Sequence, residues 1–440
     1  MNFGTIITRL AMGALTASSF LLGASAPAHA PANAPVFDAR DADLPTLERP
    51  PPVGSAAWER ACSVVHRACV RPSFATPSAV AEATLDAVDR AWDALVGVMG
   101  APAPEGPGGE PWDVFVVAPA TEGPAAFFAG RDPRSHFDRG ASFGVVDAST
   151  PIGCALDEAA ARAIARASIW RVAPATDEAS ATAQVEALAR LAAPCAPSDD
   201  DDDAISFQSA PERSIADGGS RAFERGAGMF YGWLEARFGA EPGAVVVGAW
   251  ALAPTWTASD VWRSGRWASD PTTFDVFRKS LAGALWRAST LDDVFGQFAV
   301  ARATPPLAPP EPLAAWRISW PAHARRLVSP RPVAPTGASY VVIDHAGAPP
   351  GAHLRLEAQW EDYGRMRWTA IKADASGAAL RVLPIAATDR ATSAAITVEG
   401  LDGVDHVLVV GANVGSTDHP FRPDQNEWEP HAWTLTVEGE

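Results

Sequence analysis

Apolar and polar residues alternate along the C-terminal part of the chain. In residues 354–360 (LRLEAQW), apolar side chains fall on one face of an extended chain and polar ones on the other, as a half-buried strand requires. Turn signals such as Ser376-Gly377 and Asp402-Gly403 separate segments of this kind. The pattern predicts strands at 340–343, 354–360, 366–368, 380–385, 395–398, 407–410 and 433–437. About seven short strands without a helical stretch predict an antiparallel β-sandwich over 338–440, Ig-like or jelly-roll-like.

Three- and four-residue spacing of apolar positions takes over in the N-terminal half. Residues Ala79–Met99 keep this spacing up to Gly100 and predict an amphipathic helix. The aspartate run Asp199–Asp203 predicts a solvated surface loop, because like charges at this density repel. Further helices are predicted at Asp157–Arg171, Glu178–Leu191 and Ala222–Phe238, and strands at Trp112–Val117 and Phe143–Val146. Residues 57–303 are therefore a predicted mixed α/β domain, and the predicted fold class of the chain is α+β.

Two proline-rich stretches mark the limits of these regions. Residues 304–337 contain several closely spaced prolines, and proline at this density blocks helix and removes hydrogen-bond donors. This stretch is the predicted seam between two domains, with a short strand around 316–320. Residues 31–56 are also rich in proline and predict a poorly ordered lead-in.

Residues 1–30 have the order of features found in a secretory signal. One cation, Arg9, precedes an apolar run over 10–22, and small residues follow up to Ala28-His29-Ala30. The run is too short and too rich in alanine and serine to span a bilayer. We predict a signal peptide over 1–30, cleaved after Ala30, and a protein that is periplasmic or secreted.

The charge balance excludes some classes of partner. The chain carries a formal net charge of −17 at pH 7. Nucleic acids and anionic membranes bind to cationic surfaces that release their counterions. We therefore predict that neither nucleic acid nor an anionic membrane is a partner. No segment after residue 30 resembles a membrane span.

Four cysteines are an even number in an oxidising compartment and predict two disulfides. Three connectivities are possible. A helix over 62–69 would hold the Cα atoms of Cys62 and Cys69 about 10 Å apart, too far to bridge. Pairing of cysteines within one part of the chain favours Cys62–Cys69 and Cys154–Cys195. The first pair needs a strand and a turn over 62–69.

No intact catalytic motif is present, so no catalytic residue is predicted. Residues 140–144 match the G-x-S-x-G pattern of serine hydrolases, but a strand follows Ser142 where that motif needs a helix. No two histidines lie four residues apart, so the zinc motif H-E-x-x-H is absent. A hydrolase, most simply a peptidase, whose catalytic residues are dispersed stays open as an alternative.

The order of elements in 60–300 resembles a gluzincin metallopeptidase domain. The resemblance rests on the strand and helix order, the alanine-rich helix Asp157–Arg171 and the segment Phe223–Gly239. It implies that the two zinc-binding histidines would lie where this chain has Arg162-Ala163-Ile164-Ala165-Arg166, and that Glu224 is the vestige of a glutamate ligand. The implied scaffold lacks its metal. The whole chain, including 421–433, is also similar to exported bacterial proteins of unestablished activity.

An acidic loop over 415–431 is the other candidate site. Oxygen ligands at close spacing suit Ca²⁺, which takes six to eight of them, and the candidate ligands are Asp418, Asp424, Asn426 and Glu429. A hydrogen-bonded acidic loop without an ion explains the same residues, because exposed acids usually stay solvated. No cofactor is predicted, with Ca²⁺ as the alternative.

Sixteen tryptophans are many for this length, and Trp250, Trp256, Trp262 and Trp267 lie close together. Exposed aromatic rings would bind glycans, whereas rings at strand or helix spacing pack in a core. These observations predict an exported, non-enzymatic binding or interaction protein whose partner is a protein, peptide or glycan. A diverged hydrolase and a glycan-binding protein are the alternatives.

Overall fold

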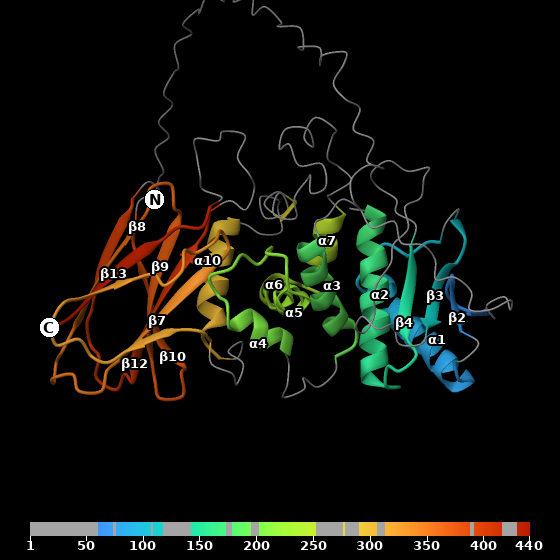
Figure 1. Ribbon diagram of the computed structural model, residues 1–440, viewed down its shortest axis with the longest axis horizontal. Coiled ribbons are helices and arrows are strands. Elements are labelled where there is room, and N and C mark those ends of the chain that lie inside the picture. The colour runs from blue at the N-terminus through green and yellow to red at the C-terminus, as the bar shows by residue number, and fades with distance from the viewer. Residues whose placement is uncertain are drawn as a thin grey trace, which may run out of the picture.

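The computed structural model describes residues 60–73, 76–106, 109–117, 142–172, 178–194, 202–251, 276–277, 290–305, 313–387, 391–415 and 429–440. The predicted signal peptide and the predicted lead-in lie outside these residues. A small sheet with its helices, a group of helices and a β-sandwich follow one another along the long axis (Figure 1). This arrangement confirms the predicted α+β class.

The N-terminal sheet is mixed. Its strands are β1 (Ala61–Cys62), β2 (Ala68–Pro72), β3 (Trp112–Val117) and β4 (Phe143–Asp147), in that order. β1 is antiparallel to β2, whereas β2, β3 and β4 are parallel. Helix α1 (Ser78–Trp92) runs on into a π-helical segment (Asp93–Val98) and stops at Gly100, whose φ of 72° favours glycine. The predicted helix and both predicted strands are confirmed.

The cysteines follow the predicted pairing as far as they are described. Cys62 and Cys69 face each other across β1 and β2 and form a disulfide. The strand and turn that this pairing requires are therefore present. Cys154 is also disulfide-bonded, and Cys195, its predicted partner, lies outside the described residues.

Helices fill the middle of the molecule. They are α2 (Cys154–Val172), α3 (Glu178–Ala192), α4 (Asp202–Gln208), α5 (Arg221–Gly226), α6 (Gly228–Phe238), α7 (Val246–Trp250) and α10 (Leu291–Arg302). α2 contacts α1 on one side and α3 on the other. None of the described helices is long and apolar enough to cross a membrane.

Two sequence predictions are corrected in this region. The predicted helix Ala222–Phe238 is two helices, α5 and α6, interrupted at Ala227. The break falls between two glycines that pack against other backbones, since a Cβ on Gly228 would lie 2.8 Å from the carbonyl oxygen of Ala183. The aspartate run is not a loop throughout, because Asp202 and Asp203 begin α4. Carboxylates at a helix N-terminus are favoured by its partial positive charge.

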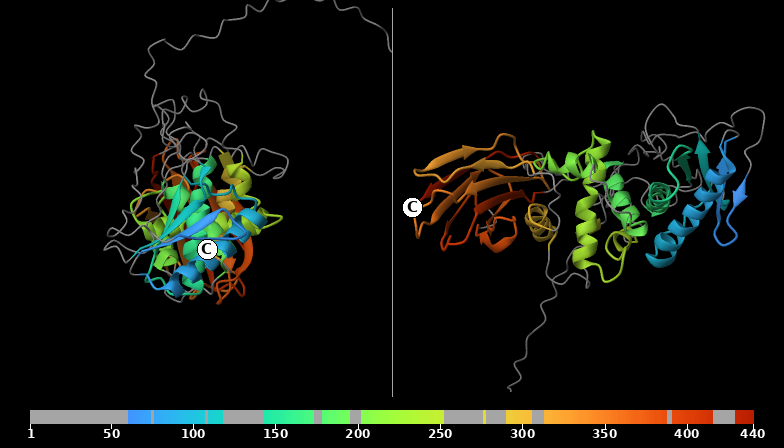
Figure 2. Two further views of the ribbon diagram at one scale, coloured as in Figure 1. Left: turned by 90° about the vertical axis from the view of Figure 1, so that its right-hand side faces the viewer. Right: turned by 90° about the horizontal axis from the view of Figure 1, so that it is seen from below.

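The C-terminal part is the predicted β-sandwich. One sheet has the order β10-β9-β12-β7-β5 and the other β11-β8-β13-β6, with all pairs antiparallel except β5 with β7. The two sheets face each other in Figure 2 and enclose an apolar core that includes Leu356, Trp368 and Leu435. The strands are β5 (Trp316–Ile318), β6 (Arg325–Val328), β7 (Ala338–Asp344), β8 (Leu354–Trp360), β9 (Met366–Ala373), β10 (Ala379–Ile385), β11 (Ser393–Val398), β12 (His406–Asn413) and β13 (Trp433–Gly439).

Much of the outer face of the five-stranded sheet is also buried, over β7, β9 and β12. Its side chains belong to the same apolar cluster as Phe295 and Phe298 of α10. The hydroxyl of Tyr340 on β7 donates to the carbonyl oxygen of Ala299 on α10 at 2.9 Å. The sheet contributes Ala338, Tyr340, Val342, Ile371, Leu408, Val410, Ala412 and Val414 to this cluster. One core therefore runs across the proline-rich stretch 304–337, while the predicted domain limits stay a prediction.

Candidate functional site

A cleft of about 340 Å³ lies at the carboxyl end of β4, between α2, α3 and α5. Ligands of open α/β sheets commonly bind outside the carboxyl ends of the strands. Four arginines and three carboxylates line the cleft together with hydroxyl and apolar side chains. The lining residues are Asp147, Ser149, Thr150, Pro151, Ala155, Glu158, Ala159, Arg162, Arg166, Thr182, Val185, Glu186, Arg221 and Arg225.

Helix α2 forms one wall of the cleft. It is rich in alanine, which has the highest helix propensity, and it has Asp157 in its first turn and Arg171 in its last turn, as the helix dipole favours. The cleft-lining residues of α2 recur at three- and four-residue steps and therefore share one face. Ala155 and Ala159 leave space there, whereas Glu158 and Arg162 supply charge.

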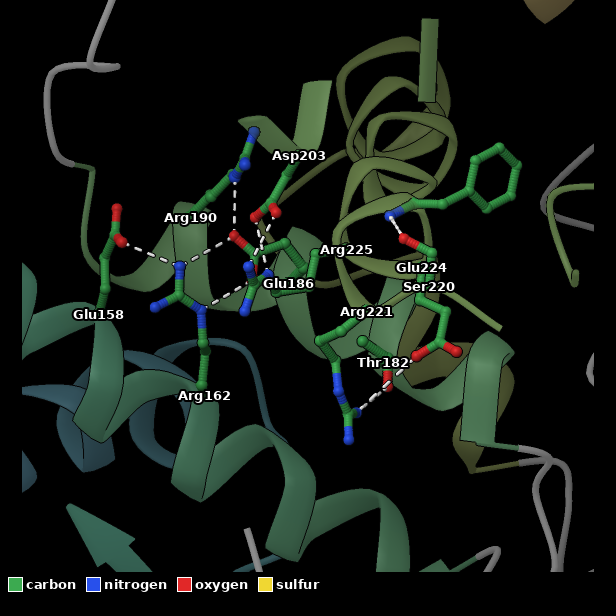
Figure 3. Close-up of polar contacts among 11 residues, drawn as sticks. Glu158, Arg162, Thr182, Glu186, Arg190, Asp203, Ser220, Arg221, Glu224 and Arg225 are labelled. Atoms are coloured by element: carbon green, nitrogen blue, oxygen red, sulfur yellow. Dashed lines mark hydrogen bonds and ion pairs between the residues drawn. The ribbon is translucent and has the colours of Figure 1, made fainter. Parts of the chain in front are cut away.

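Arg162 joins α2 to α3 through a charge network (Figure 3). Its Nε donates to Glu186 Oε2 at 2.7 Å, and its second terminal nitrogen donates to Glu186 Oε1 at 3.0 Å and to Glu158 Oε2 at 2.9 Å. Arg190 Nε donates to Glu186 Oε1 at 2.9 Å. The Glu186 side chain is 1% exposed and that of Arg162 is 23% exposed. Charge-assisted pairs with this fork geometry are the strong ones.

The network shifts the titration of its members. Burial raises the pKa of Glu186, but the hydrogen bond and charge of Arg162, followed by the charge of Arg190, outweigh burial and lower this pKa below its ordinary value. Burial lowers the pKa of Arg162, and the hydrogen bond and charge of Glu186, with Glu158, raise it above its ordinary value. Both groups are therefore charged at neutral pH.

Helix α5 supplies the opposite wall, and α4 supports it. Arg225 on α5 makes a two-pronged contact with Asp203 on α4, with Nε–Oδ2 at 2.7 Å and a terminal nitrogen to Oδ1 at 2.8 Å. Ser220 caps α5, since its hydroxyl accepts from the backbone N–H of Phe223 at 3.4 Å. Arg221 lies at the cleft, with a 60% exposed side chain, and donates to Thr182 Oγ1 at 3.1 Å.

Glu224, the predicted vestigial zinc ligand, points elsewhere. Its carboxylate accepts from the backbone N–H of Gly219 at 3.3 Å and lies 3.8 Å from Arg221. Figure 3 shows it beside Arg221, at the start of α5. Its neighbour Arg225 lines the cleft, whereas Glu224 is not among the described lining residues. The vestigial role of Glu224 stays a prediction.

The donors at the cleft do not fit zinc. Catalytic zinc takes three protein ligands, usually histidines and carboxylates. Here the guanidinium group of Arg162 pairs with Glu158 and Glu186, two of the three carboxylates that line the cleft. Within the described ranges, no group of three or more histidine, cysteine, aspartate or glutamate side chains could hold a metal ion. Of the candidate calcium ligands, Asp418, Asp424 and Asn426 lie outside those ranges and Glu429 lies within them.

Other residues singled out from the sequence have structural roles. Ser142 precedes β4, and its hydroxyl accepts from the indole of Trp112 at 3.1 Å. Trp250 is buried and donates to Gln184 Oε1 at 2.7 Å. The three tryptophans that follow it, Trp256, Trp262 and Trp267, lie outside the described residues. Ser142 and Trp250 are therefore held by the core.

Sequence reasoning assigns no role at a site to Glu186, Asp203 or Arg225. Each joins a partner on another helix, so its role depends on how the helices pack. One signal is visible in the sequence, because Glu158 with Arg162 and Glu186 with Arg190 have the four-residue spacing of helical ion pairs.

Comparisons with known proteins add little. No protein-family model matches this sequence, and no curated protein does. A solved structure described as "CBM4 structure and function" is similar at 17% sequence identity and a TM-score of 0.16, over 27% of this chain and 82% of that one. A likeness this weak indicates neither a fold nor a ligand.

Proposed function

We infer that this protein is an exported, non-enzymatic binding protein whose ligand enters the cleft between α2, α3 and α5. One observation carries this proposal. The carboxylates at the heart of the cleft, Glu158 and Glu186, are both tied to Arg162. These carboxylates therefore have fixed positions and stay charged, which suits binding better than catalysis.

A carboxylate that is ion-paired with an arginine is a poor general base for hydrolysis. A general base works best when its pKa lies near the working pH, and the lowered pKa of Glu186 moves it away from that range. A metal ion would have to displace Arg162, which makes three hydrogen bonds. The alternative, a diverged hydrolase, would need catalytic groups outside this network.

The cleft favours a short peptide segment as ligand. Its volume of about 340 Å³ is at the lower end of the range of small-ligand sites. Its lining presents both signs of charge, which suits a ligand that carries an ammonium and a carboxylate. Arg221 is exposed beside Thr182, and a guanidinium binds a carboxylate through two parallel hydrogen bonds.

Export agrees with the chemistry of the chain. The Cys62–Cys69 disulfide forms and persists in oxidising compartments. The signal peptide predicted over 1–30 would deliver the chain to such a compartment, and N-terminal sequencing of the secreted protein would find Pro31 first.

Calorimetric titration of the mature protein with a short peptide tests the cleft. We expect a peptide with a free C-terminal carboxylate to bind more tightly than the same peptide as an amide. Arg221→Gln should reduce that preference by about tenfold. Arg237→Gln, which removes an exposed arginine from α6, is the matched control and should leave it unchanged.

Metal and activity measurements separate this proposal from the hydrolase alternative. We expect no stoichiometric zinc and no cleavage of the titrated peptides. About one zinc per chain, with cleavage that a chelator abolishes, would establish the hydrolase instead. Equal affinity for the acid and the amide would contradict the role of Arg221.

Glycan binding is a second candidate function. It is favoured by a separate cavity at the sandwich, which two tryptophans help to line.

A further inference from the structure

A second cavity, of about 600 Å³, lies between α10 and the outer face of the five-stranded sheet. Asp293, Gly296, Gln297 and Val300 form its helical wall, and their spacing puts them on one face of α10. The other wall comes from β9, β10 and β12 of the five-stranded sheet, and from the end of β8 with the turn that follows it. A cavity of this size at the junction of two structural units is a common place for a small ligand.

The sheet wall offers exposed apolar surface. Val382 on the edge strand β10 is 46% exposed, and Pro384 beyond it is also exposed. Trp360 and Trp368 reach the same cavity from the core between the two sheets, where both are buried. Burying exposed apolar surface stabilises a complex by roughly 25 cal/mol per Å², so this wall favours an occupant with an apolar face.

The charges around the cavity cancel. Arg367 on β9 pairs with Asp293 on α10, and the adjacent Arg365 pairs with Asp292. A charged occupant would have to compete with one of these pairs. The uncharged polar groups of the lining are the amide of Gln297 and the hydroxyl of Thr369. Both can donate to and accept from hydroxyl groups.

Two buried donors near the cavity lack acceptors. Within the described part of the chain, the indole N–H groups of Trp360 and Trp368 have no hydrogen-bond partner. An unsatisfied buried donor costs about 1–3 kcal/mol and calls for an oxygen from water or from a ligand. An entirely apolar occupant would leave Gln297 and Thr369 unpaired.

We propose that this cavity binds a neutral saccharide. A sugar ring offers an apolar face to the sheet wall and hydroxyl groups to Gln297 and Thr369, and it carries no charge to disturb the two ion pairs. This inference rests on the second candidate function, glycan binding, and gives that function a site. It is independent of the cleft at α2.

Calorimetry of the full mature chain with short gluco-, xylo- and manno-oligosaccharides tests the site, with tryptophan fluorescence as a second readout. Gly296→Leu is the principal variant, because a Cβ there meets only Arg367 Cδ, at 3.5 Å, and a leucine side chain would fill part of the cavity. Gly232→Leu is the matched control, since Gly232 is also helical and has nothing within 4 Å of its Cβ. Leucine favours helix over glycine at both positions.

We expect at least one oligosaccharide to bind and to shift the fluorescence. Gly296→Leu and Gln297→Ala should each weaken binding by about tenfold or more, whereas Gly232→Leu should not. Binding that survives Gly296→Leu would overturn this site while leaving glycan binding intact. Tighter binding of anionic sugars would overturn the neutral saccharide. No binding by any of the oligosaccharides, or tighter binding of apolar peptides, would overturn both the site and glycan binding.

Discussion

Replacing Arg162 with alanine leaves Glu186 buried without its main counter-charge. Breaking a buried pair from one side is costly because the remaining charge stays desolvated. We expect Arg162→Ala to lower the free energy of unfolding by about 3 kcal/mol, measured by urea denaturation at pH 7. Arg190→Ala removes a more exposed partner of the same carboxylate and should cost about 1 kcal/mol or less.

The double variant Arg162→Met/Glu186→Leu is the control. Replacing both partners with apolar groups removes the stranded charge and should recover most of the loss. The loss should also depend on pH. Because the pKa of Glu186 is lower in the folded protein than the unfolded value of about 4.3, its stabilisation is present above that pH and is lost as the pH falls through the folded value. A loss that is equal at pH 7 and pH 3 would contradict the network.

At the residue scale, the sequence indicates which side chains carry charge, but not which side chains they contact. The resemblance to gluzincin domains points to Glu224 as a site residue. In the structure, the next residue, Arg225, lines the cleft. The pairs Arg162–Glu186 and Arg225–Asp203 join residues on different helices. Helical periodicity says which face a residue occupies but not which helix it meets, so these partners could not be predicted.

Close packing of helices depends on particular glycines. A Cβ on Gly226 would overlap the carbonyl oxygen of Asp203 and lie 2.6 Å from Cβ of Phe207. We expect Gly226→Ala to destabilise the protein by about 2 kcal/mol, because overpacking forces the backbones apart. Gly232→Ala on α6, where no atom is within 4 Å, should instead stabilise it by about 0.5–1 kcal/mol. Thermal melts of both variants give the comparison, and equal shifts would contradict it.

The limits of an element were predictable to the residue where one face alone is buried. Residues 354–360 alternate without exception, and β8 has the predicted limits. Helix α10 has no such prediction, although Thr290 and Asp293 form a capping box at its start and mark its N-terminus in the sequence. Strand β6 lies inside the proline-rich stretch, where its single buried residue, Leu327, leaves no pattern to read.

The sandwich depends on its neighbour. Residues 330–440 made alone would expose the outer face of the five-stranded sheet, which α10 and the other helices help to bury. We expect a β-type circular dichroism spectrum, because the fragment keeps β7 to β13 and most of the inner core, although it lacks Ile318 of β5 and Leu327 of β6. We also expect binding of a hydrophobic dye and a lower melting temperature than the whole chain. A fragment that melts with the whole chain and binds no dye would show that the outer face needs no cover.

The contact between α10 and β12 also sets an order in time. A chain emerges from its N-terminus, so α10 must wait with its apolar face open until the C-terminal strands arrive. During that interval the nearly finished protein is a substrate for proteases and chaperones. The last strands to be made complete the core of the helical part as well as that of the sandwich. A chain that stops shortly before β12 would therefore leave both cores exposed to proteases.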